Sequence, residues 1–319
     1  MRVMVTGGCG LVGSLAVRQL LELGHEPIVY ELGLRLDLLG DVQERVRFVR
    51  GDVTNLPELL AACREHRVQR ILHLASFLTP AAHDRPHPAV TTNVMGAVNV
   101  YEAVRVLGLE RGVFTSTGKV RNDARTYARN LESGDLQMAA DPYTTTKITA
   151  ELLLADYRKM YDLDLVIARF CGMIYGPGYA FTGAIGQQLQ ALVEKPLRGE
   201  PARLDEIRHG PQVPDMLYAR DAADGGVRAT VTDGLKDWVF NIVSPAKHPL
   251  AEIADAIRGA IPGAQIEVPA ATQPGSPNTP DPLARDQLGY EPRYRIGDGL
   301  GEYVEFLRTG RLRDWKVAA

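Results

Sequence analysis

The chain is poor in the residues that mark several large classes of protein. Its 319 residues include only three cysteines, Cys9, Cys63 and Cys171, which are too few and too scattered for a disulfide framework or a paired-cysteine zinc site. Aromatic residues make up 7% of the chain and the formal net charge is only −3, so there is neither an excess of stacking platforms nor a basic field for a phosphate polymer. We expect a reducing compartment, no metal site and no nucleic-acid partner.

Long apolar runs are missing as well. No stretch approaches the roughly 18 apolar residues that a membrane span requires, and the N-terminus has no charged and then apolar segment that ends in a cleavage site. The first β-branched run begins at Val3 and leads directly into a glycine-rich segment, which cleavage of a signal would remove. We therefore expect a cytoplasmic protein without membrane contacts.

What the chain does have is an alternation of short β-branched runs and longer segments of helical period, which is typical of βαβ units around a parallel sheet. At roughly 150 residues per domain, its length suggests about two domains. The expected strands span residues 3–5, 27–30, 45–49, 71–74, 112–114 and 163–168, and the expected helices 11–23, 57–65, 90–107 and 143–161. After residue 168 the pattern is less regular, with helices expected at 182–194, 250–260 and 297–307, a strand at 238–243 and a proline-rich loop at 269–282.

A glycine-rich motif, Thr6-Gly7-Gly8-Cys9-Gly10-Leu11-Val12-Gly13, follows the first expected strand and opens the first expected helix. Gly7 permits a tight turn, Gly10 lets the backbone approach a pyrophosphate, and Gly13 allows the helix to pack closely on the strand. The N–H groups and the positive dipole end at the start of the helix suit a phosphate. This placement of the motif predicts a dinucleotide-binding turn.

Glu31 ends the next expected strand, 18 residues beyond Gly13, where a carboxylate can accept hydrogen bonds from both hydroxyls of an adenosine ribose. It would also repel a 2′-phosphate, which favours NAD over NADP. Arg35 lies nearby and could reach such a phosphate, and a solvated charge at the strand end is the alternative for Glu31. Asp52 could accept the adenine amino group, and Leu74-Ala75-Ser76 would line the path of the cofactor.

Tyr143 and Lys147 lie four residues apart in an expected helix and therefore share one face. An ammonium beside the phenol lowers the pKa of the phenol toward working pH, which makes Tyr143 a general acid or base for a carbinol proton. A surface tyrosine–lysine pair is the alternative. The run Thr115-Ser116-Thr117 places hydroxyl groups at the end of an expected strand, on the cofactor edge of the sheet. Thr117, or failing it Ser116, can donate a hydrogen bond to the substrate oxygen.

With these motifs the chain resembles the extended short-chain dehydrogenase/reductases, the NAD-dependent epimerase/dehydratase group. The residues that carry the resemblance are TGGCGLVG at 6–13, Glu31, GDV at 51–53, HLAS at 73–76, Asn93-Val94-Met95-Gly96, Thr117, YTTTK at 143–147, Tyr218-Ala219-Arg220-Asp221 and Phe240-Asn241-Ile242. The resemblance implies an α/β fold, a Rossmann-like doubly wound parallel sheet with a smaller C-terminal α/β substrate lobe. Its implied division is an NAD-binding domain of residues 1–168 with 213–243, and a substrate-binding lobe of residues 169–212 and 244–319.

The resemblance also implies an assembly and roles for particular residues. A homodimer would form through the helices at 90–107 and 143–161. Thr117, Tyr143 and Lys147 would be the catalytic set, with Lys147 also bonding the nicotinamide ribose, Asn93 supporting the site, and a small-molecule substrate as the partner. The implied substrate contacts are Ser116, Thr117 and Gly172. The implied NAD contacts are Gly7, Gly10, Leu11, Val12, Gly13, Glu31, Asp52, Val53, Leu74, Ala75, Ser76, Asn93, Thr115, Tyr143, Lys147, Phe170 and Cys171.

Three departures from the family pattern narrow the expected function. Gly118-Lys119 follows Thr117, where the 4,6-dehydratases have an Asp-Glu pair for water elimination, which disfavours a dehydratase. Pro214-Asp215 replaces an Arg-Asp pair that contacts a diphosphate, and the asparagine expected after Arg169 is missing. The residues that could rebuild a diphosphate site are Arg203, Arg208 and His209. A basic stretch, either a solvated face or a receiver for a substrate carboxylate, comprises Lys119, Arg121, Arg125 and Arg129.

The expected function is that of an NAD-dependent oxidoreductase that transfers a hydride reversibly at a secondary alcohol or ketone of a small polar hydroxy compound, such as a sugar acid. One alternative is a UDP-sugar 4-epimerase with tightly bound NAD. The other is a non-catalytic NAD-sensing protein, against which the complete set of Thr117, Tyr143 and Lys147 argues. His83 and His87 have the spacing of a metal-ligand pair, but the prolines beside them break the helix that would align them.

Overall fold

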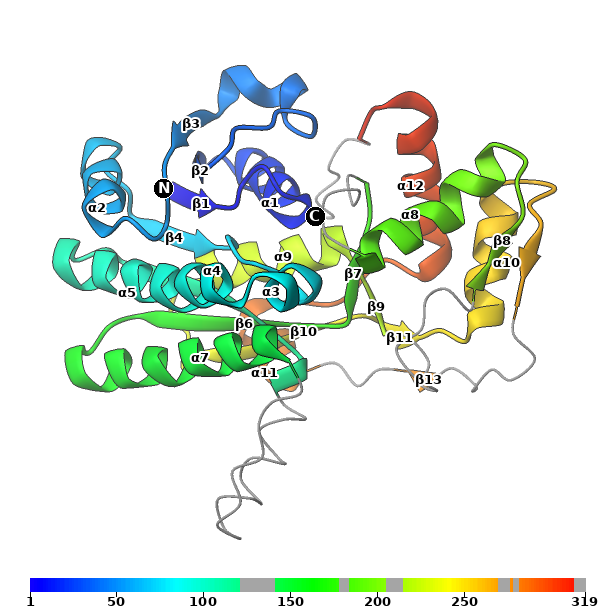
Figure 1. Ribbon diagram of the computed structural model, residues 1–319. Coiled ribbons are helices and arrows are strands. Elements are labelled where there is room, and N and C mark those ends of the chain that lie inside the picture. The colour runs from blue at the N-terminus through cyan, green and yellow to red at the C-terminus, as the bar shows by residue number, and fades with distance from the viewer. Residues whose placement is uncertain (121–140, 178–183, 205–214, 269–275, 278–280, 313–319) are drawn as a thin grey trace, which may run out of the picture.

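The computed structural model describes residues 1–120, 141–177, 184–204, 215–268, 276–277 and 281–312. Its centre is a seven-stranded parallel sheet (Figure 1). In spatial order the strands are β10 (Val239–Val243), β6 (Leu165–Cys171), β5 (Arg111–Thr117), β4 (Arg70–His73), β1 (Arg2–Thr6), β2 (Glu26–Glu31) and β3 (Arg47–Arg50). The order reverses between β1 and β4, where the carboxyl ends of the strands leave a crevice for a ligand. The predicted doubly wound fold is confirmed.

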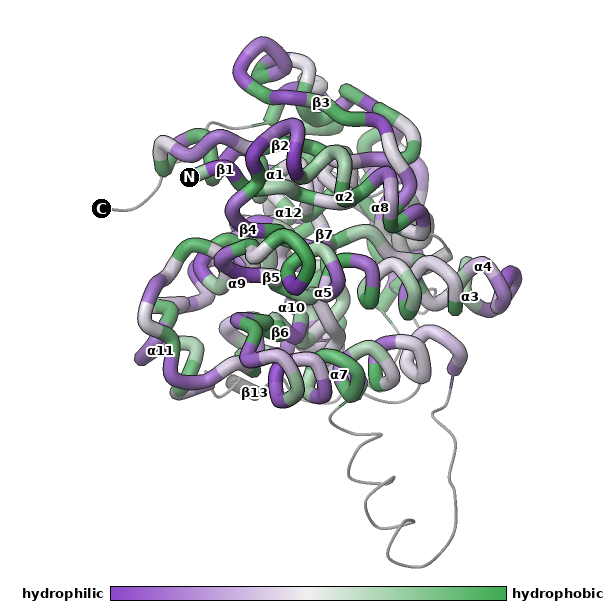
Figure 2. Tube along the Cα trace, turned by 90° about the vertical axis from the view of Figure 1, so that its left-hand side faces the viewer, coloured by the Kyte–Doolittle hydropathy of each residue, from purple (hydrophilic) through white to green (hydrophobic). Residues whose placement is uncertain are grey.

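Helices cover both faces of this sheet. They are α1 (Leu11–Glu22), α2 (Leu56–Glu65), α5 (Gly96–Leu107), α7 (Pro142–Tyr161) and α9 (Ala219–Val231). α1 and α9 pack together on one face, and α2, α5 and α7 lie side by side on the other (Figures 1 and 2). In β1, Val3 and Val5 belong to the core under α1, whereas Met4 belongs to the core under α5. Burial on both faces explains why this strand is a continuous apolar run.

Local sequence signals place the ends of several helices. Gly24 follows α1 with a φ of +75°, a left-handed conformation that glycine adopts without strain. Asn55 caps α2, because its side chain accepts a 3.3 Å hydrogen bond from the N–H of Glu58. The segment between β4 and α5 contains α3 (Thr79–Asp84), α4 (Pro86–Val90) and a π-helical turn, η2 (Thr91–Met95). The helix expected at 90–107 therefore begins at the end of α4 and continues through η2 into α5.

The smaller C-terminal lobe lies beside the carboxyl edge of the sheet (Figure 1). Its elements are β7 (Met173–Tyr175), α8 (Ala184–Leu197), β8 (Ala202–Arg203), β9 (Met216–Tyr218), β11 (Ala246–Lys247), α10 (Leu250–Ala260), β12 (Ile266–Glu267), β13 (Ser276–Pro277) and α12 (Ile296–Thr309). β7 pairs with β9 and β8 with β12, both in parallel. Arg220 of α9 and Glu302 of α12 form a buried ion pair that joins the lobe to the sheet domain.

Two further elements complete the description. A 3-10 helix, η1 (Gly40–Arg45), precedes β3, and α11 (Pro282–Leu288) packs against α9 and β10. No helix within the described ranges is both long enough and apolar enough to cross a bilayer. After β6 the chain enters the lobe, and it returns through α9 to β10, which lies at the edge of the sheet next to β6.

Candidate active site

The glycine-rich turn joins β1 to α1 at the carboxyl edge of the sheet. Gly7 has a φ of +70°, and a Cβ atom on it would lie 2.8 Å from the backbone N of Ala75. A Cβ atom on Gly13 would lie 2.2 Å from the carbonyl oxygen of Gly7. Gly10 provides no side-chain cap, and the first turn of α1 contains no acidic residue. The N–H groups of the first turn of a helix have no intrahelical acceptors, so this turn fits an anionic pyrophosphate.

Glu31 lies against this turn at the end of β2. Its carboxylate accepts a 3.1 Å hydrogen bond from the N–H of Leu32. Burial raises the pKa of Glu31, and the backbone N–H groups of Leu32 and Cys9 act in the opposite direction. Because Cys9 belongs to the glycine-rich turn, the carboxylate and the turn face the same space. The guanidinium of Arg35, the competing cation, lies 3.4 Å from the carboxylate of Asp37.

The other predicted adenosine contacts follow β3 and β4. One carboxylate oxygen of Asp52 accepts a 2.8 Å hydrogen bond from the N–H of Thr54, which forms a turn, and the side chain of Val53 is buried against Gly96. The segment after β4, Leu74-Ala75-Ser76, lies beside the glycine-rich turn, because the backbone of Ala75 is in close contact with Gly7.

Tyr143 and Lys147 occupy the first two turns of α7, whose N-cap is Asp141. The carboxylate of Asp141 accepts hydrogen bonds from the N–H and the hydroxyl of Thr144, at 2.8 Å and 3.0 Å. Lys147 is buried, and its ammonium nitrogen lies 5.8 Å from the centre of the Tyr143 ring. The same nitrogen donates a 2.9 Å hydrogen bond to the carbonyl oxygen of Thr115 in β5. The predicted proximity of the cation to the tyrosine is present.

Burial has a strong effect on the charge of Lys147. Desolvation lowers the pKa of its amine to about 7, and the carboxylate of Glu151 opposes this shift. His73, at the end of β4, stacks on Phe114 at 6.1 Å and shares a 2.7 Å hydrogen bond with Thr6. Burial, and secondarily the charge of Lys147, lowers the pKa of His73 to about 3. The sequence predicts no role for His73 itself, although the HLAS motif marks this segment.

The carboxyl end of β5 supplies the predicted hydroxyl groups. Thr117 is half-buried, and its hydroxyl oxygen lies 3.4 Å from the backbone N of Lys119. Ser116 is buried, and its hydroxyl has no hydrogen-bond partner in the described part of the chain. Ser116 is two residues from Phe114 in β5, so the two side chains point to the same face of the sheet. Phe114 belongs to the core under α7, and the ammonium nitrogen of Lys147 lies over its ring. The hydroxyl of Thr115 is used within the sheet, because it donates a 2.7 Å hydrogen bond to the carbonyl oxygen of His73.

Asn93, in the π-helical turn η2, holds two parts of the site together. Its side-chain oxygen accepts hydrogen bonds from the N–H of Phe77 at 2.7 Å and the hydroxyl of Ser76 at 3.0 Å. Its amide nitrogen donates to the carbonyl oxygen of Phe77 and to the hydroxyl of Thr146, both at 3.0 Å. Asn93 therefore ties the segment after β4 to the helix that carries Tyr143, a supporting position.

The end of β6 forms another wall. Phe170 and Cys171 are buried there, and a Cβ atom on Gly118 would lie 2.9 Å from both the Cα and the Sγ of Cys171. Only glycine therefore fits at residue 118 without a shift. Gly172 has a φ of +134°, and a Cβ atom on it would lie 3.0 Å from the carbonyl oxygen of Asp215. The chain thus turns away from the sheet immediately after its predicted nicotinamide contacts.

Lys119 follows the end of β5 and reaches the N-terminus of α7. Its ammonium nitrogen is 3.4 Å from the carboxylate of Asp141 and 3.4 Å from the hydroxyl of Thr79. The hydrogen bonds from Thr144 and the charge of Lys119 outweigh burial and lower the pKa of Asp141. Neither Thr79 nor Asp141 has a role that is predicted from the sequence. The predicted anion-binding residues that fall outside the described residues are Arg121, Arg125, Arg129, Arg208 and His209, and Pro214, which replaces the expected arginine, also lies outside them.

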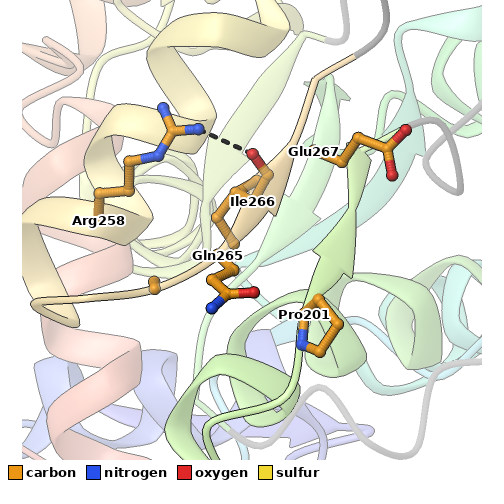
Figure 3. Close-up of a pocket in the computed structure, with 6 residues that line it drawn as sticks. Pro201, Arg258, Gln265, Ile266 and Glu267 are labelled. Atoms are coloured by element: carbon orange, nitrogen blue, oxygen red, sulfur yellow. Dashed lines mark hydrogen bonds between the residues drawn. The ribbon is translucent and has the colours of Figure 1, made fainter.

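Two cavities lie elsewhere in the molecule. One, of about 400 Å³, is in the C-terminal lobe, where Arg258 donates a 2.8 Å hydrogen bond to the carbonyl oxygen of Ile266 (Figure 3). The other, of about 620 Å³, lies at the amino edge of β1, β2 and β3, opposite the glycine-rich turn. Within the described ranges, no group of three or more histidine, cysteine or acidic side chains gathers in a way that could hold a metal.

Comparison with known proteins agrees with this arrangement. A sequence profile described as the NAD dependent epimerase/dehydratase family matches residues 3–242. UDP-glucose 4-epimerase of Mycolicibacterium smegmatis is 28% identical over 97% of this chain and 99% of that protein. UDP-glucuronic acid decarboxylase 3 of Arabidopsis thaliana is 28% identical over 94% of this chain and 87% of that protein.

Solved structures show the same fold. UDP-glucose 4-epimerase of Thermus thermophilus, in complex with NAD, is 26% identical with a TM-score of 0.74, over 97% of this chain and 99% of that one. dTDP-glucose 4,6-dehydratase of Bacillus anthracis, also with NAD, is 24% identical with a TM-score of 0.75, over 97% of this chain and 96% of that one. The chain belongs to the NAD-dependent epimerase/dehydratase family, and it is an enzyme whose cofactor is NAD.

Proposed function

We propose that the protein catalyses reversible hydride transfer between NAD and a secondary alcohol or ketone of a small polar hydroxy compound. The position of Lys147 on α7 carries the proposal. Its ammonium nitrogen donates a hydrogen bond to the carbonyl oxygen of Thr115 in β5, and the same nitrogen lies 5.8 Å from the centre of the Tyr143 ring. A titratable phenol, a cation and strand-end hydroxyl groups are the groups that proton transfer at a carbinol requires.

Each group has a separate part in this proposal. The glycine-rich turn holds the pyrophosphate through N–H groups at Leu11, Val12 and Gly13, and Glu31 accepts hydrogen bonds from the adenosine ribose. When bound, NAD supplies the carbon that accepts or returns the hydride. Tyr143 takes the proton of the substrate hydroxyl, and the charge of Lys147 favours the phenolate that does so.

The substrate oxygen needs a donor on the side of β5. Thr117 is the proposed donor, with Ser116 as the competing one, because the buried hydroxyl of Ser116 has no partner in the described part of the chain. Gly172, at the turn after β6, would border the same space. The other NAD contacts named from the sequence stay predictions. They are Asp52, Val53, Leu74, Ala75, Ser76, Asn93, Thr115, Phe170 and Cys171.

The first substrate class to test is the sugar acids, with net production of NADH. A UDP-sugar 4-epimerase is the second candidate, and the match to proteins named UDP-glucose 4-epimerase over nearly their whole length favours it. An epimerase reduces and reoxidises its NAD within one turnover, so it would retain the cofactor and release no NADH.

Ultraviolet absorbance of NADH separates these candidates. Purified protein is incubated with NAD and, in turn, with sugar acids, polyols and UDP-sugars, and the products are separated by chromatography. NADH that accumulates with a free hydroxy acid or alcohol supports the dehydrogenase. Tightly held NAD with an isomerised UDP-sugar supports the epimerase. NAD binding without turnover of any of these substrates would contradict both candidates.

We also propose that the protein is a homodimer joined through α5 and α7. Large apolar side chains are exposed on these helices and on the turns that precede α5, and these helices cover the face of the sheet opposite α1 and α9. The side chains are Val90, Met95, Val106, Leu152, Met160 and Tyr161.

A further inference from the structure

Lys119 is a cation of the site that the proposed proton transfer does not use. It follows Thr117 by two residues, and its ammonium nitrogen reaches Asp141, two residues before Tyr143. Because the backbone N of Lys119 lies 3.4 Å from the hydroxyl oxygen of Thr117, Lys119 lies between the end of β5 and the start of α7, the two elements that carry the proposed reacting groups.

The two lysines of the site are in opposite surroundings. The side chain of Lys119 is 44% exposed, whereas Lys147 is 3% exposed. An ammonium has three N–H donors, and the two described contacts of Lys119, with Asp141 and Thr79, are both long at 3.4 Å. Lys119 can therefore exchange one of these weak contacts for a shorter one to an anion without first losing a strong bond.

The closest hydrogen bonds of Asp141 do not come from Lys119. Its close hydrogen bonds come from the N–H and the hydroxyl of Thr144, at 2.8 Å and 3.0 Å, and these cap α7. A half-exposed ion pair at 3.4 Å adds little to stability. The contact with Lys119 is thus dispensable for the fold, which leaves the cation for another purpose.

The backbone under Lys119 is held in place. The N–H of Gly118 donates a 2.8 Å hydrogen bond to the carbonyl oxygen of Phe170, and Gly118 packs directly on Cys171. Nearby charges are already matched: Arg169 and Glu151 form a two-point ion pair, at 2.9 Å and 2.5 Å. The backbone of Lys119 is therefore held at the end of β5, while its half-exposed ammonium has only long contacts in the described part of the chain.

We propose that the Lys119 ammonium receives a carboxylate of the substrate and so makes the enzyme selective for acids. This inference rests on the proposed function, since it assigns the substrate class of the same site. The carboxylate can belong to a free sugar acid or to the uronic acid part of a nucleotide sugar. Lys119 is a specificity residue in either case, because the chemistry that it recognises is the same.

The test compares matched pairs of acid and neutral probes: D-galactonate with galactitol, and UDP-glucuronate with UDP-glucose. Calorimetry measures their affinities for the NAD-loaded Tyr143→Phe protein, in which turnover is suppressed. In this background Lys119→Met should weaken binding of the preferred acid at least about tenfold and leave its neutral partner unchanged, since a hydrogen bond to a charged group is lost. Lys119→Arg should retain most of the affinity. The pair that responds identifies the source of the carboxylate.

Controls keep this result independent of the proposed reaction. Lys236→Met removes the same charge from an exposed site near the opposite edge of the sheet, and it should change neither affinity. Lys119→Gln repeats the test if the methionine variant does not fold. A protein with Lys119 intact that prefers neither acid, or an equal loss for acid and neutral probes, would overturn the inference. Acid-selective binding that Lys119→Met abolishes, without turnover in the wild type, would uphold it and contradict the proposed function instead.

Discussion

At the scale of single residues, burial and catalysis make opposite demands on Lys147. Its ammonium must carry a charge to favour the phenolate of Tyr143, yet desolvation lowers its pKa to about 7. The hydrogen bond to the carbonyl oxygen of Thr115 fixes the nitrogen beside the ring in spite of this cost. The sequence could predict that Tyr143 and Lys147 share a face, but not this anchor, because the spacing of residues on a helix does not say which carbonyl oxygen lies opposite.

Replacing Tyr143 with phenylalanine removes the titrating hydroxyl with almost no change in volume. We expect Tyr143→Phe to lower kcat at least about 100-fold, because the substrate proton loses its acceptor, while NAD binding is unchanged. Initial rates and a cofactor titration measure the two effects.

Tyr157 offers a matched control for this substitution. It lies on the same helix, and its hydroxyl donates a 2.7 Å hydrogen bond to Glu102, away from the site. Tyr157→Phe should keep wild-type turnover. Near-normal turnover in Tyr143→Phe would remove Tyr143 from the mechanism.

The lowered pKa of Lys147 also predicts how stability depends on pH. Between pH 7 and 10.5 the unfolded chain holds a proton on this amine that the folded protein has released. The free energy of unfolding should therefore rise with pH across this window, by up to about 1.4 kcal/mol per pH unit, and this contribution is lost as the pH falls toward 7. Urea unfolding of the wild type and Lys147→Met at several pH values isolates this contribution. Parallel pH profiles would contradict it.

At the scale of elements, the turn between β1 and α1 depends on close backbone contact. A Cβ atom on Gly13 would meet the carbonyl oxygen of Gly7 at 2.2 Å, and backbone cannot move aside as a flexible side chain can. We expect Gly13→Ala to weaken NAD binding severely and to cost about 1–3 kcal/mol of stability. Calorimetric titration with NAD and thermal unfolding measure both effects.

Gly301 in α12 is the matched control for Gly13→Ala. A Cβ atom there would meet nothing within 4 Å. Gly301→Ala should leave NAD binding unchanged and raise stability by about 0.5–1 kcal/mol, because alanine favours a helix over glycine. Equal NAD affinity in the two variants would show that the turn does not need its close packing.

The π-helical turn η2 shows what periodicity misses. An apolar pattern predicts a helix from residue 90, and α4, η2 and α5 do continue one another. The extra residue of a π turn is not visible in such a pattern, although these turns often occur at functional sites. Here Asn93 makes hydrogen bonds to Phe77, Ser76 and Thr146, which come from distant parts of the sequence. Contacts of this kind follow from tertiary packing alone.

At the scale of the whole molecule, the predicted alternation of strands and helices corresponds to the sheet with small shifts at the ends of elements. The central strands could be predicted from the sequence because each is a largely buried apolar run between turn signals, as in β1, β4 and β6. The short strands of the lobe were missed, since β8 and β12 have two residues each and show no alternation. Their pairing depends on how the lobe packs.

The proposed homodimer gives a prediction at this scale. Leu152 and Met160 are 57% and 67% exposed on α7, so a charge there would be buried without a partner if two copies meet through this helix. We expect Leu152→Lys to convert a dimer into a monomer in sedimentation velocity. Leu283→Lys, on the exposed side of α11, should leave the dimer intact. A monomeric wild type would contradict the proposal.

The late return of the chain to the sheet has a consequence during synthesis. β6 ends at Cys171, and its edge partner β10 begins only at Val239, so ribosomes that add about 5–20 residues per second leave the edge of β6 open for several seconds. The open edge belongs to an apolar strand, Leu165–Cys171, with unpaired N–H and C=O groups. The nascent polypeptide is thus vulnerable to strand-to-strand association with its neighbours on a polysome, and slower translation of the lobe would lengthen that exposure.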